Sequence, residues 1–313
     1  MKVIVPPIKS QGIKTQLVPW INSVAEHAGA KGKWIEPFLG TGVVAFNSGY
    51  KHALLNDANP HLINFYKAIH EGTITPAKVK KYLEEANEKL SNSDENGYVY
   101  FRYVRDRFNK DFAPLDLLFL SRAGFNGMMR FGSKGNWNIP FCKKPNRFAQ
   151  SYITKIVNQV AKAKSVMTTD WIFTTTNFSN IIPLAEKDDM LYCDPPYYGR
   201  YVDYYNGWTE KDEELLFKQL KETPAKFILS TWHHNDYREN DMVKKYWNKF
   251  NIITRDHFYH SGGKLENRKT IVEALVFNFD ADVSAHNHHE NLKTKKEQLP
   301  IFELENVTLL HTV

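Results

Sequence analysis

An acidic residue, two prolines and a tyrosine follow an apolar run in the segment LYCDPPYYGR, at Asp194, Pro195, Pro196 and Tyr197. The prolines lack a backbone N–H and have a fixed φ, while their carbonyl oxygens can still accept hydrogen bonds. The segment therefore presents a carboxylate and carbonyl oxygens, rigidly held, beside an aromatic ring. This combination suits a flat group that donates hydrogen bonds and stacks, such as the exocyclic amine of a nucleobase.

Short apolar runs around this segment predict the elements that position it. The run at 33–42 is a strand that enters a glycine-containing turn, and the run at 52–57 is a second strand that ends in an acid and precedes a helix. Residues 165–171 and 189–198 are interpreted as further strands ending in acids. This alternation predicts a doubly wound α/β sheet, in which ligands bind at the carboxyl ends of the strands.

Residues 71–164 differ in character from the segments on either side. They contain charged amphipathic helices and a Gly/Asn-rich stretch, FGSKGNWNIPF, that is typical of a hairpin. We therefore predict a discontinuous catalytic domain at 1–70 and 165–280. The mostly helical insert comprises 71–164, and a polar tail comprises 281–313.

Positive charge is concentrated in the predicted insert. Residues 60–165 contain 18 Lys and Arg against 9 Asp and Glu, whereas the whole chain of 313 residues has a net charge of only +6. The stretch 121–147 has six basic residues and no acid. Such a field suits a polyanion, although a solvated basic face would give the same pattern.

The chain carries few targeting or metal-binding signals. Its first ten residues lack the apolar run of a signal peptide, and no stretch has the length of a membrane span. Cys142 and Cys193 have no metal-ligand spacing. These features predict a cytoplasmic, nucleoid-associated protein without a metal or a membrane partner.

Two motifs together resemble a known family. Asp-Pro-Pro-Tyr at 194–197 resembles the catalytic motif of amino-group DNA methyltransferases, and EPFLGTG at 36–42 resembles their cofactor loop. The order of cofactor loop, insert and catalytic motif is similar to that of Dam-like (alpha-class, D12-type) DNA adenine-N6 methyltransferases, including those of type II restriction-modification systems. The resemblance implies a Rossmann-like methyltransferase sheet. It also implies S-adenosylmethionine as methyl donor, with S-adenosylhomocysteine as product.

The resemblance also implies a cofactor site. Asp57 would bind the cofactor ribose hydroxyls, Asp170 the adenine amino group, and the two loop glycines would allow close approach of the cofactor. Ser10 and Ile13 depart from the family's first motif, which puts in doubt any packing of residue 10 on the cofactor. The full set implied for the cofactor is Gly12, Lys14, Glu36, Phe38, Gly40, Gly42, Asp57, Asp170 and Asp194.

The segment RAGFNGMMRFGSKGNWNIPF resembles the target-recognition part of the same enzymes. Arg130 and Asn126 are candidates for reading base edges, Met128 for a wedge beside an opened base step, and the lysines for phosphate contacts. A structural or phosphate role remains the alternative for each. The implied DNA-binding set is Lys9, Arg122, Asn126, Met128, Arg130, Lys134, Asn136, Lys143, Lys144 and Arg147.

By this resemblance, the target adenine leaves the DNA duplex and stacks on Tyr197, while Asp194 and the Pro195 carbonyl hold its amine. A cytosine-N4 methyltransferase and a DNA-binding relative without activity remain alternatives. An RNA methyltransferase fits the insert less well. Double-stranded DNA is the expected partner, and a cognate restriction endonuclease is a second candidate. The tail segment QLPIF, at 298–302, also resembles peptides that bind the replication sliding clamp.

Overall fold

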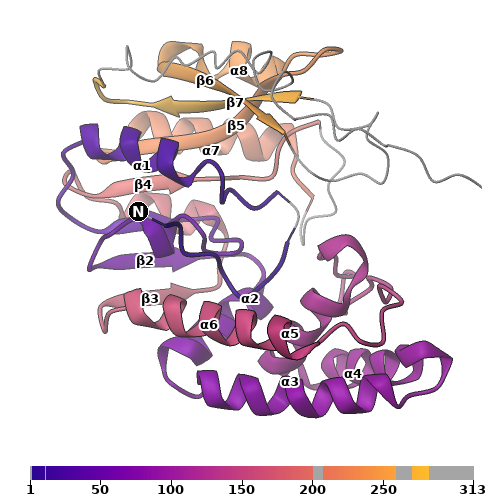
Figure 1. Ribbon diagram of the computed structural model, residues 1–313. Coiled ribbons are helices and arrows are strands. Elements are labelled where there is room, and N and C mark those ends of the chain that lie inside the picture. The colour runs from indigo at the N-terminus through magenta and orange to yellow at the C-terminus, as the bar shows by residue number, and fades with distance from the viewer. Residues whose placement is uncertain (1, 11, 200–206, 259–269, 282–313) are drawn as a thin grey trace, which may run out of the picture.

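The structure is a computed structural model that describes residues 2–10, 12–199, 207–258 and 270–281. Its centre is a seven-stranded sheet in the order β3-β2-β1-β4-β5-β7-β6 (Figure 1). The strands are β1 Trp34–Glu36, β2 Ala53–Asn56, β3 Trp171–Thr174, β4 Met190–Cys193, β5 Lys226–His234, β6 Asn251–Phe258 and β7 Thr270–Phe277. The pairs among β1 to β5 are parallel, and β7 is antiparallel to both β5 and β6. The predicted doubly wound α/β sheet is confirmed.

Helices cover this sheet (Figure 1). They are α1 Val18–His27, α2 Pro60–His70, α7 Glu210–Glu222 and α8 Asp241–Lys245. Every residue of β1 and β4 is buried, as expected for parallel strands covered on both faces. Thr209 and Asp212 form a capping box at the start of α7. No helix in the described part of the chain has the length and apolar character of a membrane span.

Four further helices gather beyond the β3 edge of the sheet (Figure 1). They are α3 Pro76–Ser91, α4 Tyr98–Asp111, α5 Pro114–Ala123 and α6 Gln150–Val166. The predicted hairpin between α5 and α6 consists of a turn at Gly135 with two isolated bridges, Phe131↔Trp137 and Gly124↔Phe141. One apolar cluster runs from the sheet into these helices. The residue boundaries of the insert remain a prediction.

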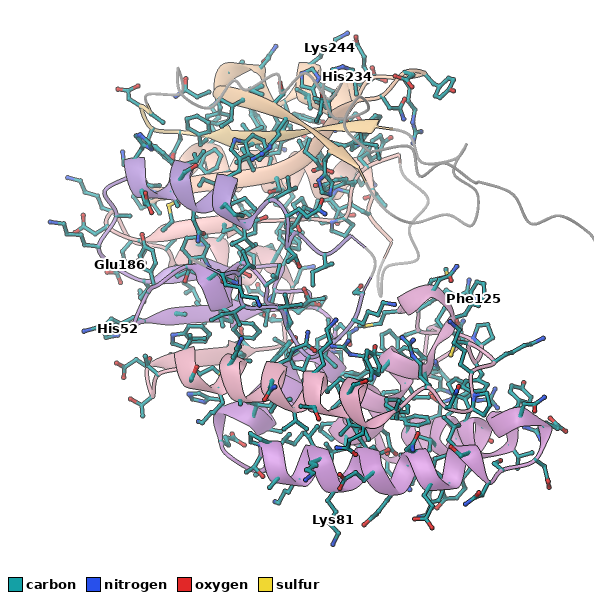
Figure 2. All side chains as sticks on the ribbon, in the orientation of Figure 1. His52, Lys81, Phe125, Glu186, His234 and Lys244 are labelled. Atoms are coloured by element: carbon teal, nitrogen blue, oxygen red, sulfur yellow. The ribbon has the colours of Figure 1, made fainter. Side chains whose placement is uncertain are left out.

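The strand predicted at 165–171 is wrong. Helix α6 extends to Val166, and β3 begins only at Trp171. Asp170 therefore precedes β3 and pairs with His52, 3.3 Å away, which precedes β2. Figure 2 shows His52 at one end of the sheet, and the amino ends of β2 and β3 meet there. Asp170 consequently lies outside the cavity at the carboxyl ends of the strands, so its predicted contact with the cofactor adenine is wrong. The strand was misplaced because it was predicted directly after a long helix, whose apolar residues keep helical spacing at Ile153, Ile156, Val160 and Ala163.

Arg122 joins the N-terminal segment to the insert and does not face solvent. Its guanidinium donates to the Pro7 carbonyl at 2.7 Å from Nε, and from Nη2 to Gln159 Oε1 at 2.7 Å. Its Nη1 donates to the Tyr152 hydroxyl at 3.2 Å. Only 5% of the residue is exposed. The predicted DNA contact of Arg122 is therefore wrong, because a buried cation saturated by carbonyl and hydroxyl oxygens cannot reach a phosphate.

Replacing Arg122 should destabilise the protein. In Arg122→Met the Pro7 carbonyl and Gln159 lose a buried donor, so the free energy of unfolding should fall by about 2 to 3 kcal/mol. Exposed Lys143→Met, from the same basic stretch, should change it by less than about 0.5 kcal/mol. Urea titration followed by circular dichroism measures both. Equal stabilities of the two variants would contradict this structural role.

Candidate active site

The sheet changes direction between β1 and β4. The chain proceeds from β1 through β2 to β3 on one side, and from β4 to β5 on the other. Glu36 ends β1 and Asp194 directly follows β4, so both side chains reach the same edge of two neighbouring parallel strands. A cavity of about 420 Å³ opens there. Ligands of doubly wound sheets bind at such a switch point.

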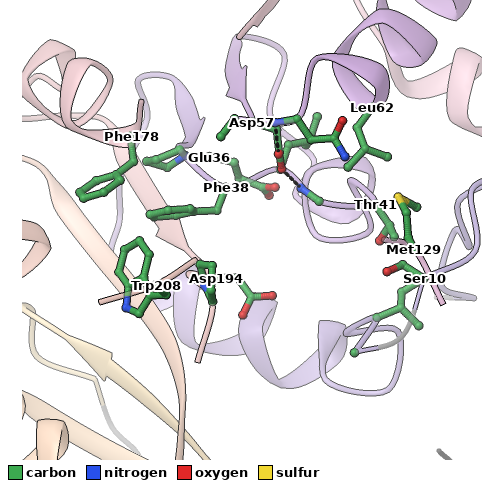
Figure 3. Close-up of a pocket in the computed structure, with 18 of the residues that line it drawn as sticks. Ser10, Glu36, Phe38, Thr41, Asp57, Leu62, Met129, Phe178, Asp194 and Trp208 are labelled. Carbon is green, nitrogen blue, oxygen red and sulfur yellow. Dashed lines mark hydrogen bonds between the residues drawn. The ribbon is translucent and has the colours of Figure 1, made fainter. Parts of the chain in front are cut away.

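The loop after β1 is fastened to the residue that follows β2. Gly40 has a φ of 51° and its N–H donates to Asp57 Oδ2 at 2.7 Å, while the Asn59 N–H donates to Oδ1 at 2.8 Å (Figure 3). Gly42 has a φ of 73°, and a Cβ there would lie 2.9 Å from the ring of Phe46. Burial raises the pKa of Asp57, and the two N–H donors oppose that shift. These two hydrogen bonds favour the ionised form of Asp57 at the cavity wall, whereas burial favours the protonated form.

Glu36 contributes a second buried carboxyl group. The Trp34 indole donates from Nε1 to Glu36 Oε1 at 2.7 Å. Burial raises the pKa of Glu36 well above its ordinary value, and the negative charge of Asp194 adds to the shift. Because burial makes ionisation of this group unfavourable, a cation placed beside it would gain a favourable interaction.

Asp194 is held by a buried lysine. Lys14 Nζ lies 3.0 Å from Asp194 Oδ1 and 4.7 Å from the centre of the Tyr197 ring. The Tyr197 hydroxyl in turn donates to Glu273 Oε2 on β7 at 2.5 Å. Burial raises the pKa of Asp194, although the ammonium of Lys14 opposes that shift. The catalytic-motif segment is thus fixed by contacts to the N-terminal segment and to β7.

Three aromatic rings line one side of the cavity. Phe38 lies 5.2 Å from Phe178 and 5.6 Å from Trp208, measured between ring centres, and these rings stand opposite Met129 and Ser10 in Figure 3. Such a wall can hold a planar ring by stacking or edge contacts.

Glu213 on α7 fixes the position of this wall. It accepts from the Trp208 indole at 2.6 Å and from the Trp247 indole at 2.8 Å. Phe178, Trp208 and Glu213 were not predicted from the sequence. The run WIFT at 171–174 is rich in β-branched and aromatic residues, and reading it as the strand would have placed Asn177 and Phe178 at its carboxyl end.

The structure brings most of the predicted cofactor residues together. Tyr197 and Pro195 are buried beside the cavity, and Gly42 lies in the turn behind it. Asp170 is the member of the set that lies elsewhere. Those that line the cavity are Gly12, Lys14, Glu36, Phe38, Gly40, Asp57, Asp194 and Pro196.

Apart from the buried Arg122, the predicted DNA-binding residues fall into three groups. Met128 and Arg130 line the cavity, and Arg130 also donates to Asn138 Oδ1 at 2.6 Å. Lys9 and Arg147 are partly buried: Lys9 packs against Gly127, and Arg147 donates to the Arg122 carbonyl at 2.7 Å. Burial lowers the pKa of Lys9. The exposed residues are Asn126, Lys134, Asn136, Lys143 and Lys144.

Known proteins resemble this chain over most of its length. It is 32% identical to a DNA adenine methylase of Haemophilus influenzae over 61% of this chain and 63% of that protein. It is 30% identical to the retron Ec67 DNA adenine methylase of Escherichia coli over 68% and 71% of the two chains. It is 24% identical to the type II methyltransferase M1.LlaDCHI of Lactococcus lactis over 88% and 95%. The chain thus spans less than two thirds of the first of these relatives and nearly all of the last.

Residues 10–261 match a single family, and this range includes the cofactor loop, the insert and the Asp194–Tyr197 motif. The match extends over well more than half of the chain and contains every described residue that lines the cavity. The chain therefore belongs to the D12 class of N6 adenine-specific DNA methyltransferases.

Proposed function

We propose that this site transfers a methyl group from S-adenosylmethionine to N6 of an adenine turned out of a DNA duplex. One observation carries the proposal: the Asp194–Lys14 pair and the Asp57-bound glycine loop open into the same cavity. Family membership supports the chemistry, and the geometry supports these residues as its site.

The residues of the cavity fit this methyl donor. Three carboxyl groups, Glu36, Asp57 and Asp194, surround it, and burial raises the pKa of each. Such a set favours a ligand with cationic groups, and the wall of Phe38, Phe178 and Trp208 suits an adenine ring. When bound, S-adenosylmethionine supplies a methyl group activated by a positively charged sulfur.

The catalytic segment would act mainly by holding the target amine. Asp194 and the Pro195 carbonyl accept from its two hydrogens, which favours a pyramidal nitrogen whose lone pair can attack. Lys14 fixes one oxygen of Asp194, and Glu273 fixes the Tyr197 ring that supports the base. Turning a base out of the duplex costs about a few kcal/mol, and stacking offsets part of this. Positioning and preorganised charge account for the rate gain without a covalent intermediate.

The insert would hold the DNA. Exposed Lys134, Lys143 and Lys144 suit phosphate contacts, which give affinity without reading sequence. Arg130 suits a base edge because it lines the cavity, and Asn126 suits one because it is exposed close to Arg130 in sequence. Met128 lines the cavity, where an apolar side chain can fill the opened base step.

The wider setting also belongs to the proposal. Relatives named as type II methyltransferases support a cognate restriction endonuclease as partner, with both proteins acting in the cytoplasm. The QLPIF segment at 298–302, proposed to bind the sliding clamp, lies outside the described residues. No observation favours methylation of cytosine or RNA.

Asp194→Asn should abolish most of the activity, since an amide accepts hydrogen bonds with one oxygen only and carries no charge. We expect a fall of about a hundredfold or more in N6-methyladenine formed on unmethylated plasmid DNA. Asp170→Asn is the matched control and should stay within about twofold of the original protein. Mass spectrometry of the digested nucleosides measures both variants. N4-methylcytosine as product, or equal losses in the two variants, would contradict the proposal.

The affinity for S-adenosylmethionine should rise with pH. The raised pKa values of Glu36 and Asp194 mean that protons are retained above the ordinary carboxyl range near 4, and the cavity becomes more negative as pH increases through the raised values. The free energy of unfolding of the protein without ligand should change in the opposite direction and fall as pH rises. Carboxyls with a raised folded-state pKa favour the folded state at low pH, and this contribution is lost as pH rises.

Isothermal titration at pH 5.5, 6.5 and 7.5 measures this pH dependence. S-adenosylhomocysteine, which lacks the sulfonium charge, is the matched control and should show a smaller rise in affinity. Identical pH profiles for the two ligands would mean that these carboxyls do not respond to the sulfonium.

A further inference from the structure

A buried histidine connects the cofactor side of the molecule to the turn of the insert. His61 stands in the first turn of α2, and its Nε2 lies 2.9 Å from the carbonyl oxygen of Gly135. Gly135 is 74 residues away in sequence, buried, and has a φ of 77°. A carbonyl oxygen only accepts, so Nε2 carries the proton and donates.

The ring of His61 is enclosed by aromatic residues of the insert. Its centre lies 5.1 Å from that of Phe108, 4.8 Å from Phe112 and 4.9 Å from Phe131. Burial lowers the pKa of His61, and this keeps the ring neutral. Phe131 also lines the cavity, so His61 packs against a residue of the proposed cofactor site.

Hydrogen bonds continue from His61 to the glycine loop. The Asn59 side chain accepts from the His61 N–H at 3.0 Å, and the Asn59 N–H donates to Asp57 at 2.8 Å. Asp57 accepts from the Gly40 N–H at 2.7 Å. Gly40, Asp57 and Asn59 all line the cavity, whereas His61 does not. The chain of bonds therefore starts where the cofactor would bind and ends at Gly135.

The turn at Gly135 carries Arg130, which is proposed to read a base edge, and Asn136 of the predicted DNA-binding set. Gly135 N–H donates to the Gly132 carbonyl at 2.9 Å, and the Gly132 N–H donates to the Asn136 carbonyl at 2.8 Å. One step further, the Asn138 N–H donates to the Arg130 carbonyl at 3.2 Å. A shift of the turn would therefore move Arg130 and Asn136.

From this geometry we infer that His61 is a positioning residue that locks the DNA-recognition turn 130–138 to the cofactor loop. Binding of the cofactor then orders the turn and raises the affinity for DNA. Bound DNA raises the affinity for the cofactor by the same factor. The inference rests on the proposed function, because it takes the cavity as the cofactor site and the turn as the DNA reader.

Two variants separate the hydrogen bond from the packing of the ring. His61→Phe keeps an aromatic ring and removes the donor, whereas His61→Gln places an amide N–H near the original Nε2 position. The ligand is S-adenosylhomocysteine, and the DNA is a duplex containing a site mapped by sequencing DNA methylated by the unaltered protein. The coupling factor is the ratio of the ligand's dissociation constants without and with that duplex.

We expect a coupling factor of at least about fivefold in the unaltered protein. In His61→Phe it should fall towards one, while affinity without DNA changes by less than about twofold, since His61 lies outside the cavity lining. His61→Gln should restore much of it. The preference for the mapped site over a duplex with one base pair changed should also be strongest in the unaltered protein, intermediate in His61→Gln and weakest in His61→Phe.

Hydrogen exchange of the unaltered protein is a test that needs no variant. S-adenosylhomocysteine should slow exchange of the amides at 132–137, although residues 132–137 do not line the cavity. Unchanged exchange there, or equal coupling in the original protein and His61→Phe, would overturn the inference. Failure of the proposed function looks different: the original protein would then bind no S-adenosylhomocysteine or leave all DNA unmethylated.

Discussion

Three carboxyl groups, at Glu36, Asp57 and Asp194, line one cavity, and much of the surrounding structure keeps them there. Glu36 is fully buried, and the other two are partly buried. Parallel strands that end at a common edge bring them together, and each group resists ionisation because water is excluded. Hydrogen-bond donors and a positive charge next to each carboxyl group offset part of the cost of ionisation. Asp57 receives two backbone N–H groups, Glu36 an indole N–H, and Asp194 the ammonium of Lys14. A site arranged in this way gains from a positively charged ligand, which favours the ionised carboxyl groups.

Lys14 has a central place in this arrangement. At 3.0 Å the attraction between unit charges is on the order of 5 kcal/mol in a medium of intermediate dielectric, before the desolvation of both groups is counted. Lys14 comes from the N-terminal segment, which Arg122 attaches to the insert through the carbonyl of Pro7. The position of the catalytic carboxylate thus depends on a segment that the insert helps to hold.

The sequence was sufficient to predict the elements whose signals are local. The acid after β4 and the glycine turn after β1 each depend on a few adjacent residues, and the structure has them where the sequence predicted them. Asp170 and Arg122 were misjudged because their surroundings come from distant parts of the chain. A strand start hidden behind a long helix moved Asp170 to the wrong edge, and no local pattern shows that Arg122 faces Pro7 rather than solvent.

The same distinction explains why the wall of the cavity was largely missed. Phe178 and Trp208 lie 30 residues apart in sequence and meet only because β3 and α7 bring their loops to the same edge of the sheet. Glu213 supports this wall because it accepts hydrogen bonds from the indoles of Trp208 and Trp247, whereas its sequence context suggests an ordinary acid in the first turn of a helix. Motif residues therefore mark where chemistry occurs, while the residues that shape the cavity become visible only when the topology is known.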